Sequence, residues 1–393
     1  MGEQTTLRDV CLAIEDCEHK TAPESPRSAT YGYSIGTPNI RNGRILLDSA
    51  KRIDEPTYQQ WTARIRPQRN DIILTREAPV GEAGLIDGSN RICLGQRTVL
   101  LRPDAAKIAP RYLHYRLLSP MIQEHMHSHA EGSTVPHLNV NEIRSLHLGT
   151  IPSLEVQQSI AAVLGALDDK IAVNERIALA TDELIRLRYS EVCLRVESTV
   201  PIASMGALIH DAVSIELLKG HENYIGLEHM PKRNIWLNQW ASAASVASGK
   251  NRFRRGDILF GKLRPYFHKV GIAFVDGVSS TDILVIRPAR DSLRGWLLAA
   301  LSSDDVVAHA SMVGDGTRMP RAKWSDIAGY EVPWPGQDHV EHFGETVDLL
   351  VKRIISAFTE NRILTELRDT LLPRLMSGEL RVREAEEIVG GAL

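Results

Sequence analysis

Short apolar runs and long periodic stretches alternate along this chain of 393 residues. The short runs predict β-strands, because each holds four to six mostly apolar residues bounded by polar ones. They are Asp71–Thr75, Thr98–Leu101, Asp257–Phe260 and Asp282–Ile286. A stretch with helical spacing follows in each half, at about 110–130 and about 292–310. The pattern therefore predicts a mixed α/β structure that occurs twice.

Each half ends in a stretch whose apolar residues advance in alternating steps of three and four. This spacing is that of a coiled-coil seam and predicts helices over about 154–192 and 339–372, the second ended by Pro373. One such stripe would also fit a core helix, but two at equivalent places favour an antiparallel helix pair. Asn174 lies near the middle of the first helix and Asn361 somewhat past the middle of the second, so the two can approach and share a hydrogen bond. If they do not meet, each needs another partner or water. The seams are Ile160, Leu164, Leu167, Ile171, Asn174, Ala178, Thr181 and Ile185, and Val340, Phe343, Val347, Leu350, Ile354, Ala357, Asn361 and Leu364.

The two halves are copies of one another, with a period of roughly 184 residues. Five segments return in the same order: Asn70–Leu74 as Gly256–Phe260, Val80–Gly81 as Val270–Gly271, Val99–Pro103 as Leu284–Pro288, Gly132–Pro136 as Gly316–Pro320, and Ile151–Pro152 as Trp334–Pro335. The repeat predicts an α+β protein with two mixed domains separated by two long antiparallel coiled-coil helices. We expect domains at 1–153 and 198–335, and helical regions at 154–197 and 336–393.

Charge is distributed unevenly, although the net charge is only −3. Residues 231–270 contain nine Lys and Arg and one acid, Asp257, whereas the two helical regions are acidic. Trp, Tyr and Phe interleave with these cations, which favours contact with DNA over a solvated face.

Other classes of protein receive little support. The four cysteines form no C-x-x-C pair, so we expect reduced thiols in a cytoplasmic protein rather than a zinc site or disulfides. No apolar run reaches 18 residues, so no membrane span is expected. The spacing of His125, His127 and His129 fits a solvated helix end better than a metal site. Residues 256–263 lack the Ser or Thr of a phosphate-binding loop at Leu263.

Three segments resemble type I restriction–modification specificity subunits. Ile151–Gln157 with Ile160–Ile171 is similar to the central conserved region of that family, and Leu371–Leu380 to its C-terminal signature. Asp257–Tyr266 resembles a run common in its target-recognition domains. One departure is Pro335–His339, where the fuller Pro-Leu-x-x-Gln form is absent.

The resemblance implies a non-catalytic subunit that reads a bipartite, gapped sequence in double-stranded DNA. Its helices would act as a ruler and dock DNA methyltransferase (modification) subunits, which motor–nuclease (restriction) subunits then join. No cofactor and no metal are expected. The alternatives are a coiled-coil scaffold that binds only protein, and an enzyme whose site is not recognised.

Candidate DNA-binding residues fall into two groups. The first should read bases, and consists of Arg41, Asn42, Arg44 and Lys51 in the first domain and Lys232, Arg233, Asn234 and Arg252 in the second. The other group lies in or beside the repeated segments and should contact mainly phosphates or the adjoining groove, because shared segments are poor places for differing specificity. It consists of Arg76, Lys262, Arg264, Arg318 and Arg321, with Tyr266 beside them.

Overall fold

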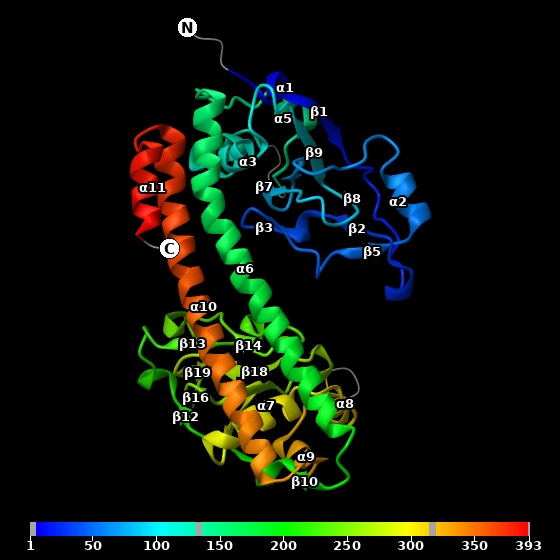
Figure 1. Ribbon diagram of the computed structural model, residues 1–393, viewed down its shortest axis with the longest axis vertical. Helices are drawn as coiled ribbons and strands as arrows, with labels where there is room; N and C mark the ends of the chain where they lie inside the picture. Colours follow the sequence, from blue (N-terminus) through cyan, green and yellow to red (C-terminus); the bar gives the residue numbers. More distant parts are fainter. Residues whose placement is uncertain (1–4, 131–135, 314–319, 392–393) are drawn as a thin grey trace. The chain divides into compact units, whose positions relative to one another are not determined.

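A computed structural model describes residues 5–130, 136–313 and 320–391 (Figure 1). The chain forms two compact units. Unit 1 consists of Met1–Asp169 with Ile363–Leu393, and unit 2 of Lys170–Arg362. The long helices α6 (Leu154–Cys193) and α10 (Gln337–Ser377) contribute a segment to each unit.

Unit 1 is built on two sheets. The larger has the order β1-β9-β6-β7 and is antiparallel throughout, with β1 Cys11–Asp16, β9 Thr98–Pro103, β6 Ile72–Arg76 and β7 Val80–Leu85. The smaller has the order β5-β2-β8 (Lys51–Ile53, Gly32–Ile35, Ile92–Leu94), with β2 and β8 parallel. The helices are α1 (Leu7–Val10), α2 (Glu55–Trp61), α3 (Pro110–Leu118), α4 (Pro120–Ser128), α5 (Val140–Arg144) and the C-terminal α11 (Val382–Gly390).

Unit 2 repeats this plan. Its first sheet has the order β11-β20-β17-β18-β14 (Gly206–Leu208, Ile283–Pro288, Ile258–Gly261, Val270–Ala273, Trp236–Leu237). Its second has the order β12-β16-β19-β13-β15 (Ala212–Val213, Lys250–Phe253, Gly277–Ser279, Asn223–Ile225, Ala241–Ser242). Helices α7 (Arg294–Leu301), α8 (Asp304–Val313) and α9 (Trp324–Ala328) follow, and β10 (Thr199–Pro201) pairs with β21 (Glu331–Pro333).

The same buried ion pair stabilises both copies. Arg102 donates from Nε and Nη2 to Asp71 at 2.9 and 2.7 Å, and Arg287 donates to Asp257 at 2.7 Å from both nitrogens. Each aspartate side chain is 3% exposed. The two-pronged geometry compensates for removing the carboxylate from water. These four residues lie in the segments that the sequence repeats, so the repeat preserves a structural pair at one end of two neighbouring strands in each unit.

The predicted seams are buried. Except for Leu350, which is partly buried, all of their residues belong to the core. Within unit 2, Asn174 Nδ2 donates to Asn361 Oδ1 at 2.8 Å, and Asn361 Nδ2 donates to the Ile171 carbonyl at 3.4 Å. This confirms the expected contact between the two asparagines. Glu360 Oε2 also accepts from Asn174 Nδ2 at 2.7 Å, and this hydrogen bond lowers the pKa of the Glu360 carboxyl.

One expectation about the long helices is wrong. Helix α10 continues through Pro373 to Ser377, and Gly378, with φ 78°, follows it. Proline removes one hydrogen bond, but tertiary contacts hold the last turn: Leu375 is buried, and Arg116 donates to the Met376 carbonyl at 2.7 Å. The helical stretches expected at about 110–130 and 292–310 are confirmed, and each consists of two helices, α3 with α4 and α7 with α8.

No helix in the described ranges has both the length and the apolar character needed to cross a bilayer.

Candidate nucleic-acid interface

Arg76 and Lys262 occupy equivalent places at the end of the central strand of each unit. The Arg76 N–H donates to the Arg97 carbonyl and its own carbonyl accepts from Leu138 N–H, at 3.0 and 2.9 Å. Lys262 makes the same pair of bonds with Asp282 and Ala322, both at 2.9 Å. The repeat therefore places a cation at one backbone position in both units.

Arg76 is already paired within the protein. Its Nη1 donates to Asp16 Oδ2 at 2.9 Å, and His19 Nε2 lies 2.9 Å from the same oxygen. The Arg76 and Asp16 side chains are 17% and 20% exposed. A phosphate at this position would have to share the guanidinium with that carboxylate.

Lys51 lies beside a cavity of about 440 Å³ that adjoins the same strand end, since Ala78 and Arg97 also line it. Ser34, Thr37 and Asn39 form its small polar walls. Lys51 is exposed and has no acidic partner among the described residues. Lys51 is therefore available to an external anion.

The other three candidates of unit 1 belong to a hairpin. Asn42 and Gly43 form its two-residue turn, with φ 51° and 79°, between β3 (Ile40–Arg41) and β4 (Arg44–Ile45). The buried His114 ring donates from Nε2 to the Gly43 carbonyl at 2.9 Å, and Arg44 donates to the Asp168 carbonyl at 3.5 Å. The hairpin thus packs on α3 and α6. Arg41 and Asn42 are exposed on it.

In unit 2 the candidates gather around the short 3-10 helix η7 (Pro265–Phe267), which follows β17. Lys232 Nζ lies 4.6 Å and Arg264 Cζ 5.9 Å from the centre of the Phe267 ring. Tyr266 is 52% exposed. The structure brings Lys232, Lys262, Arg264 and Tyr266 to one basic and aromatic surface, the η7 surface.

Two further cations of this region have acidic partners. Arg233 Nη1 is 2.8 Å from Asp304 Oδ1, and Arg321 Nη2 is 3.4 Å from Asp282 Oδ1. The side chains of Arg233, Asp304 and Arg321 are more than half exposed, and that of Asp282 is 28% exposed. Because water screens both ion pairs, either arginine can exchange its carboxylate partner for a phosphate. Arg318 lies outside the described residues.

The remaining two candidates have internal hydrogen-bond partners. Asn234 Oδ1 accepts from Trp236 N–H at 2.9 Å, which shapes the chain before β14. Arg252 Nη1 donates to Glu222 Oε1 at 2.5 Å on the second sheet, and this bond lowers the pKa of the Glu222 carboxyl.

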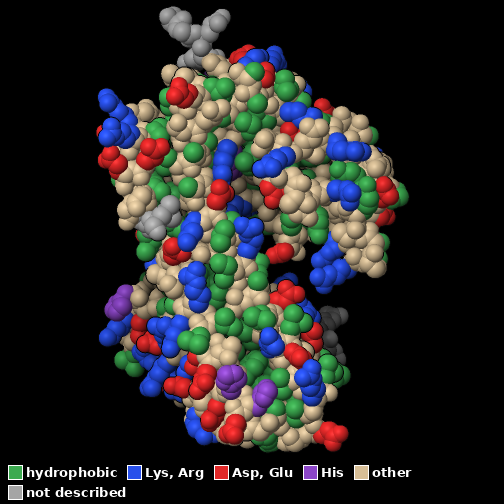
Figure 2. Space-filling view, in the orientation of Figure 1, with side chains coloured by type: hydrophobic (Ala, Val, Ile, Leu, Met, Phe, Trp, Pro, Cys, Tyr) green, Lys and Arg blue, Asp and Glu red, His purple; other side chains and the backbone are tan. Residues whose placement is uncertain are grey.

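The basic run at 231–270 does not form one surface. Arg254 and Arg255 precede β17 and Lys262 follows it, so they lie at opposite ends of the strand. Arg255 lines a cavity of about 250 Å³ together with Arg294, which begins α7, and Lys352 of α10. On the face drawn in Figure 2, Lys and Arg side chains gather at the edge of unit 2 near β12 and β16. The charge pattern indicated a basic region, but the strand divides it.

Sequence reasoning missed His268, which holds the η7 surface together. Its side chain is 2% exposed, and Nε2 lies 2.8 Å from the Ser302 carbonyl. Its carbonyl accepts from Arg233 N–H at 2.9 Å, and its N–H donates to the Pro265 carbonyl at 2.7 Å. Burial lowers the pKa of the ring, which favours its neutral form. Because its side-chain partner lies 34 residues away, no local pattern marks this role.

Within the described residues, one group of side chains has metal-ligand spacing: Asp16, Cys17 and His19. The Asp16 carboxylate is already occupied by Arg76 and His19, so this group is better explained as an ion-pair cluster. The rings of His125 and His129 are 4.4 Å apart, and His129 Nδ1 donates to the His125 carbonyl at 2.9 Å.

Comparison with known proteins finds one kind of relative. The family model described as the type I restriction modification DNA specificity domain matches residues 3–180. The MjaIX specificity subunit of Methanocaldococcus jannaschii is 23% identical over 375 residues, covering 85% of this chain and 83% of that protein. The HindI specificity subunit of Haemophilus influenzae is 21% identical and covers 88% and 94%.

A solved structure shares the fold. The S subunit of a type I restriction–modification system from M. genitalium matches with a TM-score of 0.53 at 16% identity, covering 94% of this chain and 95% of that one. The related sheets of units 1 and 2 and the long helices α6 and α10 define the class of fold: two mixed α/β domains with two long helices. Residues 3–180 thus match the type I restriction modification DNA specificity domain, and most of the chain is similar to type I specificity subunits.

Proposed function

We propose that this chain is the sequence-specific DNA-recognition subunit that directs partner methyltransferase and motor–nuclease subunits to a bipartite, gapped target. The observation that carries the proposal is the repeat: two units with the same sheet order present different side chains at equivalent strand ends. A common frame with different side chains suits two unlike half-sites in one duplex.

Each unit is assigned one half-site. The domain at 1–153 reads one half and the domain at 198–335 reads the other, while regions 154–197 and 336–393 set the gap. Lys51 in unit 1 and the η7 surface in unit 2 supply cations without acidic partners among the described residues. As the specificity subunit, the chain is the non-catalytic component, so methyl transfer and cleavage belong to its partners, in the cytoplasm.

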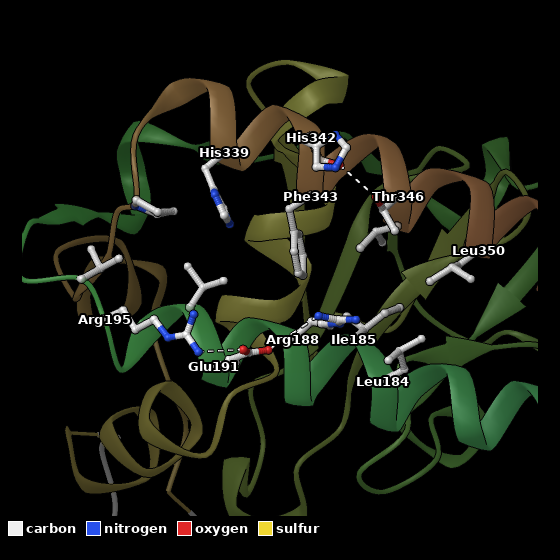
Figure 3. Close-up of a pocket in the computed structure, with 14 residues that line it drawn as sticks. Leu184, Ile185, Arg188, Glu191, Arg195, His339, His342, Phe343, Thr346 and Leu350 are labelled. Atoms are coloured by element: carbon white, nitrogen blue, oxygen red, sulfur yellow. Dashed lines mark hydrogen bonds and ion pairs between the residues drawn. The ribbon is translucent and has the colours of Figure 1, made fainter.

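Helices α6 and α10 offer a docking surface for the modification subunits. Between them lies a cavity of about 660 Å³ whose apolar lining includes Ile185, Phe343 and Val347 (Figure 3). Arg188 and His339 lie at the same cavity. Leu184, which also lines it, is 45% exposed. A partially uncovered apolar surface between two family-defining helices suits a helical segment of a permanent partner.

Charge insertion tests this docking. Leu184→Glu should abolish co-purification with the modification subunit while leaving DNA affinity of the isolated chain unchanged. Leu12→Glu is the matched control, because Leu12 on β1 is 69% exposed and lies in unit 1, outside the α6–α10 cavity. Full complex formation by the Leu184 variant would move the docking surface elsewhere.

Selection from random DNA tests the recognition itself. The full chain, mixed with a pool of random duplexes, should enrich two short sequence elements at a fixed spacing. A scaffold that binds only protein would enrich nothing and would retard no duplex in a gel. A single continuous element would contradict the assignment of one half-site to each unit.

A further inference from the structure

Unit 2 carries an insertion at the strand end that unit 1 lacks. The isolated bridges Glu77–His137 and Leu263–Arg321 are equivalent, and each is followed by the next strand, β7 from Val80 or β18 from Val270. Two residues lie between Glu77 and the start of β7 in unit 1, whereas six lie between Leu263 and the start of β18 in unit 2. The additional residues form the turn Pro265–His268, which contains η7.

This turn is held in one conformation. Arg264 and His268, at its two ends, have φ of 51° and 54°, a region that side chains other than glycine seldom occupy. The buried His268 fixes the turn to Ser302, and its carbonyl receives the N–H of Arg233. A left-handed residue at each end of a short turn persists only where surrounding contacts impose it, and such strain is concentrated at functional positions.

An exposed ring stands on this rigid turn. Among all Phe, Tyr and Trp residues, every one of which the structure describes, Tyr266 alone is exposed. Its ring meets Phe267 edge-on, with centres 4.9 Å apart and planes at 66°. Phe267 in turn packs beneath Lys232 and Arg264. The packing orders Tyr266 without covering it, so folding alone does not account for its position.

Cations lie beside this aromatic pair, because Lys232 and Arg264 approach the Phe267 ring and Lys262 lies two residues before Arg264. Lys232, Lys262 and Arg264 have no acidic partner in the described part of the chain. Two acids of this region, Asp304 and Asp282, are already paired with Arg233 and Arg321. An aromatic side chain with cations around it matches the form of a duplex, in which phosphates flank a groove and stacked bases.

Unit 1 has a cavity at the strand end that corresponds to the η7 turn of unit 2. The turns after β2 and β13 are equivalent, because the N–H of Gly36 bonds to Asn39 Oδ1 at 3.0 Å and that of Gly226 to His229 Nδ1 at 2.9 Å. Thr37 lines the 440 Å³ cavity of unit 1, whereas Leu227 stands at its place in unit 2, with Lys269 bonded to its carbonyl. The protrusion is therefore specific to unit 2.

We propose that Tyr266 is a wedge that enters the duplex and unstacks one base step in the half-site read by unit 2, while unit 1 leaves its half-site stacked. Lys232, Lys262 and Arg264 hold the phosphates on either side of that step. The inference rests on the proposed function and adds a deformation of DNA that is confined to one half-site.

The test uses the purified full chain and the duplex that it enriches from random DNA. 2-Aminopurine, whose fluorescence rises on unstacking, is placed at one position at a time across both half-sites. We expect a rise at one step in the half-site of unit 2 and at no position in the other half-site. Tyr266→Phe keeps the ring and should keep the signal. Tyr266→Ala should lose the signal and bind roughly 5- to 150-fold more weakly, with an unchanged salt dependence because no charge is removed.

The outcomes are separable. If the wild-type chain selects a target but no position brightens, or if Tyr266→Ala keeps both signal and affinity, the wedge is wrong and the recognition function stands. If the wild-type chain selects no sequence, the proposed function itself fails. Leu12→Ala, which removes an exposed side chain from β1 of unit 1, should match the wild type in both signal and affinity.

Discussion

At the scale of single residues, the candidate cations differ in what already neutralises them. Arg76 and Arg252 have acidic partners with the carboxylate largely buried, Asp16 and Glu222 at 20% and 16% exposure. Lys51 and Lys262 have none among the described residues. A phosphate adds most free energy of binding where it meets an unpaired cation, because a paired one must first give up its partner.

Lys262 should act as a phosphate contact. Replacing it with Ala removes one cation and should reduce the slope of log affinity against log salt by about one unit, with sequence preference unchanged. Arg252→Ala, the matched control, should change the slope less because Glu222 already neutralises that charge. The measurement is DNA affinity over a series of salt concentrations. An unchanged slope with altered sequence preference would assign Lys262 to base readout.

Residue types were predictable here, whereas their partners were not. The interleaved cations and aromatics of 231–270 mark a region that includes the η7 surface, and the repeat singles out Arg76 and Lys262. Asp16 lies 60 residues from Arg76, and Glu222 lies 30 from Arg252. Such pairs depend on strand order, which the local pattern does not contain. For the same reason, the tethered hairpin of Asn42 and Arg44 was not foreseen.

At the scale of elements, the heptad pattern predicts both long helices, because their buried residues recur in alternating steps of three and four along the sequence. The Pro373 expectation fails since the contacts that hold the last turn of α10, such as Arg116 with the Met376 carbonyl, come from a distant segment. Within unit 2, the buried Asn174–Asn361 pair costs stability relative to apolar residues: Asn174 Oδ1 has no hydrogen-bond partner.

The asparagine pair therefore has a predictable energetic signature. Asn174→Leu should lower the free energy of unfolding by about 1–3 kcal/mol, because it leaves the buried Asn361 carbonyl oxygen without its donor. Replacing Asn174 and Asn361 together with Leu should recover most of that loss. Urea denaturation of the three chains measures both effects. Equal stability of the single variant and the wild type would mean that the hydrogen bond contributes nothing.

At the scale of the whole molecule, the repeat was the most informative feature of the sequence. It predicted two mixed α/β structures, and the order β1-β9-β6-β7 of unit 1 recurs as β11-β20-β17-β18 in unit 2. The offset between the copies rises from 186 residues at Asn70 to 190 residues at Val80, so the repeat contains the four-residue insertion. It does not contain the conformation of the Pro265–His268 turn, which depends on distant contacts such as that of His268 with Ser302.

The helices should set the gap in the target. Four residues inserted after Ala178 add about 6 Å and roughly one turn, so the seam approximately persists. On B-DNA this corresponds to about two base pairs. We expect the preferred spacer to lengthen while both half-sites stay the same, as read by mapping the sites that the variant complex methylates. Unchanged spacing with full activity would leave the helices as docking surfaces only.

The exchange of one domain shows whether each unit reads its own half-site. A chain whose residues 198–335 are replaced by the corresponding domain of another specificity subunit is expressed with the modification subunits, and the methylated sites are sequenced. The account predicts that one half of the bipartite target changes while the other half is retained. A change in both halves, or in neither, would contradict independent reading by the two units.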